Sequence, residues 1–124
     1  MRRVRRVRRA PTRASQAEFL LHKEAARVLV QARLAHFNAQ YQFTYGRVAI
    51  KNTLSRWGSC STKGNLNFNY RLIHLSPEQQ DYVIVHELCH VKEFNHAAGF
   101  WSLVAEQCPD FQRIRTELKK MRML

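Results

Sequence analysis

The segment His86-Glu87-Leu88-Cys89-His90 constrains the fold more than any other part of the sequence, because the chemistry of its side chains requires a helix. Four residues of α-helix turn the chain by about 400°, so the two imidazoles emerge within about 40° of each other, one turn apart. That spacing suits two bonds to one metal ion. Glu87 lies about 100° further round, where it can reach a metal-activated water but not the metal beside the histidines. The motif predicts a metal-binding helix of the zinc-hydrolase type, with Glu87 as general base.

A third protein ligand is needed if zinc is to keep one coordination position open for water. His96 lies six residues after His90, and Asn95 before it can adopt the left-handed conformation that ends helices. Glu93, three residues after His90, is the competing ligand. We favour His96, because a residue beyond the helix end can swing across to complete a tetrahedral site.

Apolar spacing and turn residues predict one α+β domain around this helix. Ser15 and Glu18 are typical of a capping box at the start of a long helix, and Ser76 with Pro77 and Gln79 is typical of another helix start. The expected helices cover residues 15–40, 77–94, 98–108 and 110–124. The expected strands cover residues 47–50 and 66–70, with a hairpin centred near residues 62–65, and the segment 56–60 is expected to form a strand near the metal.

The charge is concentrated at the N-terminus. The net charge is +12, and seven arginines fall within the first 13 residues, where there is no acidic residue. We expect residues 1–14 to form a basic, disordered arm that can bind nucleic acid or an acidic surface, and residues 15–124 to form the single domain. The sequence has no apolar run of membrane-spanning length and three cysteines without a CxxC pair, which favours a cytoplasmic protein. It does not indicate an oligomeric state.

Several motifs together resemble one family. In chain order they are Ser55-Arg56-Trp57-Gly58-Ser59-Cys60-Ser61, Gly64-Asn65-Leu66-Asn67 with Asn69, Asp81-Tyr82-Val83, the His86–His90 motif, Asn95-His96 and Phe100-Trp101. From about Phe19 to Phe111 the chain resembles the YgjP-like metallopeptidase-domain family. The resemblance implies a zincin-like fold, with a small mixed sheet packed against the long N-terminal helix and the motif helix and followed by C-terminal helices. It also implies Zn²⁺ at His86, His90 and His96, with Glu87 as catalytic base, but no particular substrate.

We therefore interpret the chain as a zinc metallopeptidase acting on a peptide or protein. Arg56 could bind a substrate carboxylate or phosphate or form a structural ion pair, and Asn67 and Asn69 could bind the substrate backbone or simply face solvent. Phe100 and Trp101 are expected to pack beneath the site. The metzincin group is excluded, because Glu93 stands where that group needs glycine.

Three alternatives stay open. The first is a metal-dependent hydrolase of nucleotides or other phosphate esters, which would use Arg56 and the arm. The second is a non-enzymatic nucleic-acid-binding protein with a structural zinc. The third is a SprT-like protease acting on DNA-bound proteins, although the Arg56–Cys60 segment fits the YgjP-like family better.

Overall fold

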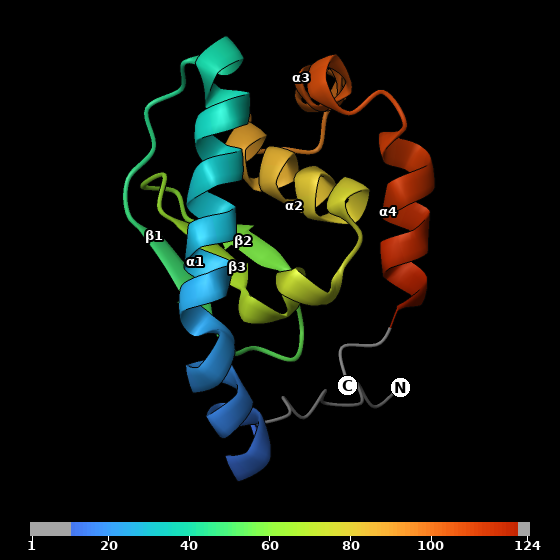
Figure 1. Cartoon of the computed structure of the whole chain (residues 1–124). Coiled ribbons are helices and arrows are strands. Elements are labelled where there is room, and N and C mark those ends of the chain that lie inside the picture. The colour runs from blue at the N-terminus through green and yellow to red at the C-terminus, as the bar shows by residue number, and fades with distance from the viewer. Residues whose placement is uncertain (1–10, 122–124) are drawn as a thin grey trace, which may run out of the picture.

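The computed structural model describes residues 11–121 and confirms the α+β class. A small sheet is covered on one face by helices from the N-terminal and middle parts of the chain (Figure 1). The elements are α1 (Arg13–Tyr41), β1 (Val48–Lys51), β2 (Gly58–Cys60), β3 (Leu66–Asn69), the 3-10 helix η1 (Tyr70–His74), α2 (Pro77–His90), α3 (Ala98–Gln107) and α4 (Phe111–Lys120).

The long N-terminal helix starts two residues earlier than the sequence predicted. Thr12, not Ser15, is the N-cap, and its hydroxyl accepts the Ser15 backbone N–H at 3.1 Å. The extended backbone of Thr12 turns this hydroxyl onto the free donors of the first helical turn. Arg13 therefore belongs to α1, while residues 1–10 of the expected arm lie outside the described residues.

The sheet has the order β1-β3-β2, so β2 forms one edge. β1 runs parallel to β3, and β2 runs antiparallel to it. The expected hairpin joins β2 to β3, and Gly64 takes the left-handed conformation (φ 81°) that its turn requires. Leu66 and Phe68 are completely buried, so their face of β3 belongs to the core.

The motif helix begins as predicted. Ser76 and Gln79 exchange both bonds of a capping box, and Pro77 occupies the first turn. The helix ends at His90, however, and not near Phe94: the chain makes a turn at Val91 and Lys92, and the His90 ring donates from Nδ1 to the Glu93 carbonyl oxygen.

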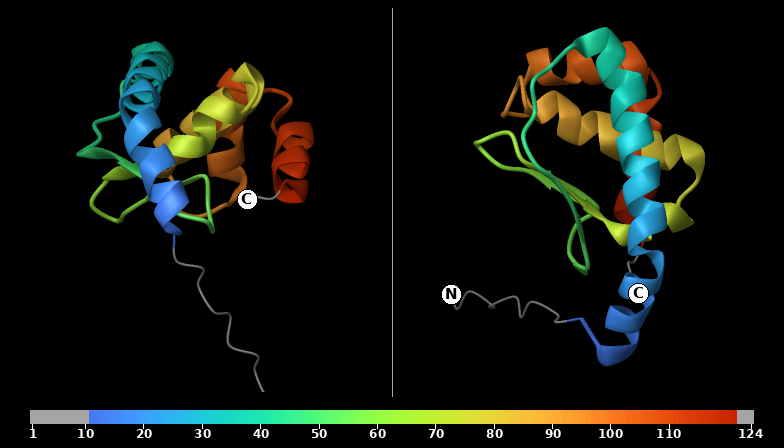
Figure 2. Two further views of the ribbon diagram at one scale, coloured as in Figure 1. Left: turned by 60° about the horizontal axis from the view of Figure 1, so that its bottom comes forward. Right: turned by 60° about the vertical axis from the view of Figure 1, so that its left-hand side comes forward.

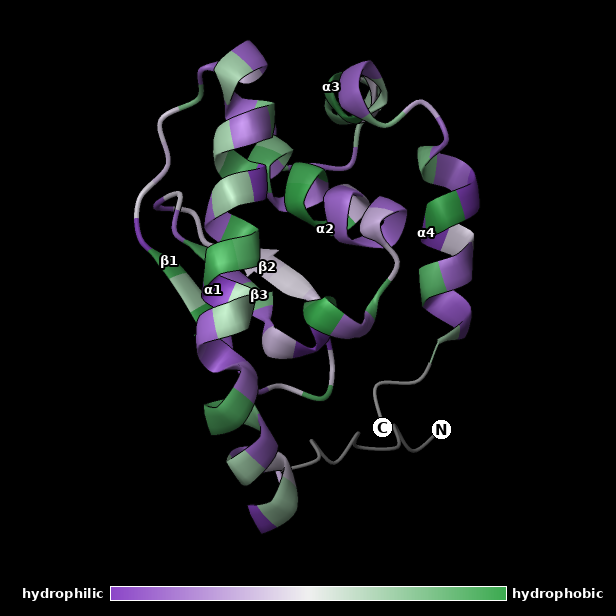
Figure 3. Cartoon of the chain, in the orientation of Figure 1, coloured by the Kyte–Doolittle hydropathy of each residue, from purple (hydrophilic) through white to green (hydrophobic). Residues whose placement is uncertain are grey.

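The helices hold the motif helix from several sides. α1 and α2 pack over one face of the sheet, and α3 and α4 flank α2 (Figure 2). Arg33 on α1 makes two bonds, of 2.8 and 2.9 Å, to the Asp81 carboxylate on α2. α4 is amphipathic (Figure 3), and its Ile114 and Leu118 are buried. Within residues 11–121, no helix combines the length and apolar character that a membrane crossing needs.

Candidate metal and catalytic site

Three histidines converge at the end of α2. One ring nitrogen from each of His86, His90 and His96 lies within 4.8 Å of those of the other two. The Nε2 atoms of His90 and His96 are 2.9 Å apart. The end of α2 at His90 allows the following loop to bring His96 back onto the two helical imidazoles. These three side chains could hold one metal ion.

The surroundings of the cluster fix its orientation. His90 directs Nδ1 to the Glu93 backbone carbonyl at 3.1 Å, which leaves Nε2 turned toward His96. Phe100 stacks on the His90 ring with centroids 4.3 Å apart, and Trp101 lies 5.6 Å from the His96 ring. The expectation that α3 supplies aromatic packing beneath the site is therefore confirmed. Glu93 takes part through its backbone, while its carboxylate lies beside Gly99.

The electrostatic environment favours neutral imidazoles. Burial, with the nearby His86, lowers the pKa of His90. Burial and the neighbouring His86, His90 and Arg115 lower the pKa of His96. A histidine must be deprotonated at the ligating nitrogen to bind a metal, so both shifts favour metal binding.

Glu87 is held between α2 and the sheet. Its side chain is 8% exposed, and its Oε2 lies 3.2 Å from His86 Nδ1. Gly58 of β2 lies against it: a Cβ at that position would stand 2.9 Å from Glu87 Cγ and 3.1 Å from the Asn67 carbonyl oxygen. Only glycine therefore lets β2 approach Glu87 this closely, which explains the glycine in the Arg56–Cys60 segment.

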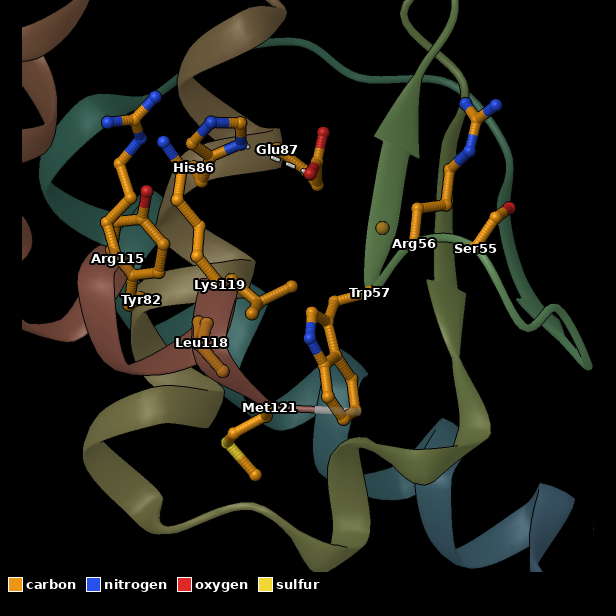
Figure 4. Close-up of a pocket in the computed structure, with 12 residues that line it drawn as sticks. Ser55, Arg56, Trp57, Tyr82, His86, Glu87, Arg115, Leu118, Lys119 and Met121 are labelled. Carbon is orange, nitrogen blue, oxygen red and sulfur yellow. Dashed lines mark hydrogen bonds and ion pairs between the residues drawn. The ribbon is translucent and has the colours of Figure 1, made fainter. Parts of the chain in front are cut away.

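A pocket of about 370 Å³ opens beside His86 and Glu87 (Figure 4). Its walls come from the chain leading into β2, from the middle turns of α2 and from α4. The lining residues include Trp57, Tyr82, Val83, Arg115, Leu118, Lys119 and Met121. Trp57 packs partly against the core and also lines this pocket.

The predicted substrate residues line a second pocket, of about 220 Å³, which contains Arg56, Asn67 and Asn69. Arg56 also lines the rim of the pocket beside His86, although Figure 4 shows its side chain directed away from Glu87. Asn69 is 2% exposed, and its amide Nδ2 donates to the carbonyl oxygens of Thr53 (2.6 Å) and Arg56 (3.1 Å). Asn69 thus supports the loop before β2, and a substrate contact by Arg56 or Asn67 stays a prediction.

Sequence reasoning did not assign Arg115 and Lys119 to the site. Both line the pocket beside His86. Near the end of a helix, a lysine such as Lys119 is explained by the helix dipole alone, so its type and place do not indicate a site. The available signal was their spacing of four residues next to the apolar Ile114 and Leu118, which places both on one flank of an amphipathic helix.

A second group with metal-binding side chains lies on the surface between α1 and η1. It consists of Glu18, His22 and His74, with Glu18 Oε1 3.8 Å from His74 Nε2. Glu18 and His74 are about half exposed. This group provides a useful control in metal-binding experiments on the His86–His90–His96 cluster.

The mixed sheet, the motif helix and the convergent histidines define a zincin-like metallopeptidase. The chain belongs to the YgjP-like metallopeptidase domain family, whose model matches residues 2–121. The structure is similar to that of the metallopeptidase zymogen of Pyrococcus abyssi abylysin, with a TM-score of 0.65, 25% identity, and coverage of 75% of this chain and 96% of that one. It shares its fold with the metallopeptidase zymogen of Methanocaldococcus jannaschii jannalysin (TM-score 0.63, 18% identity, coverage 73% and 94%). A comparison with curated proteins finds no match.

Proposed function

We propose that the chain is a zinc-dependent peptidase in which His86, His90 and His96 bind the metal and Glu87 is the general base. The observation that carries this proposal is the convergence of three imidazole nitrogens within 4.8 Å beside a buried carboxylate and an adjoining pocket. Three neutral imidazoles are a donor set that Zn²⁺ favours, and they leave a fourth position free.

Zinc supplies Lewis-acid activation of water and of the scissile carbonyl when it is bound. The Glu87 carboxylate takes the proton from the attacking water and delivers it to the leaving amine, so that one side chain acts first as base and then as acid. Its burial between α2 and β2 keeps it in place for both transfers.

The edge strand supports a peptide as substrate. In the part of the chain that the structure describes, β2 pairs with β3 on one side only, and it passes directly beside Glu87 at Gly58. An extended peptide can add to the free side of such a strand through main-chain hydrogen bonds, independently of its sequence. A peptide bound along β2 places its backbone next to the Glu87 carboxylate, which accepts the proton from water.

Metal content and turnover test the proposal together. We expect purified protein to hold zinc at the cluster, and His90→Ala to lose about one zinc ion per chain together with peptide hydrolysis. His22→Ala is the matched control, because it removes a histidine from the surface group and should keep hydrolysis. Unchanged zinc content in His90→Ala would contradict the ligand assignment. Hydrolysis of phosphate esters without hydrolysis of peptides would favour the alternative activity.

A further inference from the structure

Two cations of α4 face the pocket beside the metal cluster. Arg115 and Lys119 stand one turn apart, and both extend toward the His86 side of the pocket (Figure 4). We call the pocket lined by Trp57, Val83, Arg115, Leu118, Lys119 and Met121, next to His86 and Glu87, the α4 pocket. Its position places any group bound there next to the bond that the site would cleave.

These two cations lack the partners that a neighbouring cation has. Arg113, on the same helix, contacts the carboxylates of Glu78, Asp110 and Glu117. Among residues 11–121, by contrast, no carboxylate oxygen lies within 4.0 Å of a side-chain nitrogen of Arg115 or Lys119. The guanidinium of Arg115 instead rests over the Trp101 ring, 5.3 Å from its centroid, which holds it beside the cluster without neutralising it.

The remaining lining defines what kind of anion fits. Trp57, Val83, Leu118 and Met121 give the pocket an apolar wall. A carboxylate at the end of a short aliphatic chain satisfies both parts of this lining, because methylene groups pack on the wall while the oxygens bind the cations. The planar guanidinium of Arg115 also suits the two oxygens of a carboxylate.

We propose that the α4 pocket binds a carboxylate of the substrate next to the scissile bond, so that the enzyme prefers acidic peptides. The carboxylate can belong to an acidic side chain or to a free C-terminus, which offers the same chemistry to Arg115 and Lys119. This inference rests on the proposed peptidase function, and it adds a substrate class to that function.

Matched peptides test this preference. Peptides that differ only by Glu, Gln or Lys on either side of the cleaved bond separate the charge of the side chain from its size. Amidated and free C-termini then separate the two sources of a carboxylate. We expect kcat/KM for the Glu peptide to exceed that for the Gln peptide by about 10- to 100-fold, the usual effect of a hydrogen bond to a charged group. If the free C-terminus is the source, the preference should follow the terminal carboxylate.

Two double variants separate the pocket from overall charge. Arg115→Gln with Lys119→Gln should abolish the preference, so that kcat/KM for the Glu peptide falls to the value that the same variant has for the Gln peptide. Arg113→Gln with Lys120→Gln removes the same net charge from α4 outside the pocket, and it should retain the preference. An equal loss of the preference for the Glu peptide in both double variants would contradict the proposal, because it would indicate a general electrostatic effect.

Binding measurements distinguish failure of this inference from failure of the proposed function. Zinc-loaded Glu87→Gln should bind the labelled Glu peptide at least tenfold more tightly than the Gln peptide, even if the parent cleaves neither. Absence of cleavage with this preference intact would contradict the peptidase proposal alone. Equal binding of both peptides, with or without a free C-terminus, would overturn the α4-pocket proposal. Stronger competition by inorganic phosphate than by glutarate, lost in Arg115→Gln with Lys119→Gln, would also overturn it in favour of a phosphate ligand.

Discussion

At the scale of single residues, the site depends on one buried carboxylate. Replacing Glu87 by Gln keeps the shape of the side chain and removes its ability to accept a proton. We expect Glu87→Gln to retain zinc and to lose about 10²- to 10⁴-fold in kcat, the usual contribution of a positioned general base. Metal analysis and peptide turnover on the same sample measure both effects. A variant that hydrolyses peptide at the parent rate would remove Glu87 from the mechanism.

Gly58 sets how closely β2 approaches that carboxylate. In Gly58→Ala the new methyl would lie 2.9 Å from Glu87 Cγ and 3.1 Å from a β3 carbonyl oxygen, so the strand or Glu87 must move. We expect unfolding to become easier by about 1–3 kcal/mol, with reduced turnover and unchanged zinc content. Gly99→Ala is the control, since its methyl meets only the Glu93 carboxylate at ordinary contact distance. Equal stability and activity in the two variants would contradict the close packing at Gly58.

At the scale of elements, β3 carries two asparagines with different roles, because Asn69 supports a loop and Asn67 is more accessible. Asn69 holds the loop that leads into β2, whereas Asn67 donates a single bond, of 3.3 Å, to the Ser59 hydroxyl. We expect Asn69→Ala to lower the free energy of unfolding by about 2–3 kcal/mol, because the Thr53 and Arg56 carbonyl oxygens lose their donor and a buried side chain is removed. Asn67→Ala should cost less than about 1 kcal/mol. Urea unfolding measures both variants, and similar losses would contradict the supporting role of Asn69.

The elements that carry clear local sequence signals could be predicted, whereas two helix ends could not. The Ser76 capping box, the hairpin and the extent of α3 follow from neighbouring residues, and the structure has all three. The start of α1 at Arg13 was missed, because Ser15 ranks above Thr12 as a cap and is followed by Glu18, which favours the later start. The end of α2 at His90 was missed, because Asn95 is the first residue after the motif of a type that commonly ends helices.

The site shows the same division. The spacing of His86, Glu87 and His90 follows from the geometry of one helix, so the sequence alone could place them together. The position of Asn67 depends on which face of the sheet meets α2, which strand alternation alone does not reveal. Arg56 lies in the loop before β2, where no periodicity applies. Likewise, Arg115 enters the site only because α4 packs beside α2. Periodicity can predict the buried face of α4, but it does not identify the neighbour that its flank meets.

At the scale of the whole molecule, metal binding should be coupled to stability. The three ligands come from α2 and from the loop before α3, so a bound ion links segments that separate on unfolding. A free zinc concentration of about 100 times Kd should add about 2.7 kcal/mol to the unfolding free energy. We expect a chelator to lower the Tm of the parent and of His22→Ala but not of His90→Ala. A parent Tm independent of zinc would contradict the link.

Alkaline pH should weaken the fold through a buried thiol far along the chain from the motif. Burial, helped by the negative charge of Asp81, raises the pKa of Cys108 from 9.0 to about 12. Above pH 9 the unfolded chain loses this proton while the folded chain keeps it, so the thiol's contribution is complete below pH 9 and is lost as the pH rises toward 12. Between pH 8 and 10.5 we expect Cys108→Ala to lose roughly 1–2 kcal/mol less unfolding free energy than the parent. The Cys60→Ala variant serves as a comparison for a thiol whose pKa is raised less far, to about 11. Parallel pH profiles for the parent and Cys108→Ala would show that Cys108 ionises equally in both states, contrary to its burial between α2 and α4.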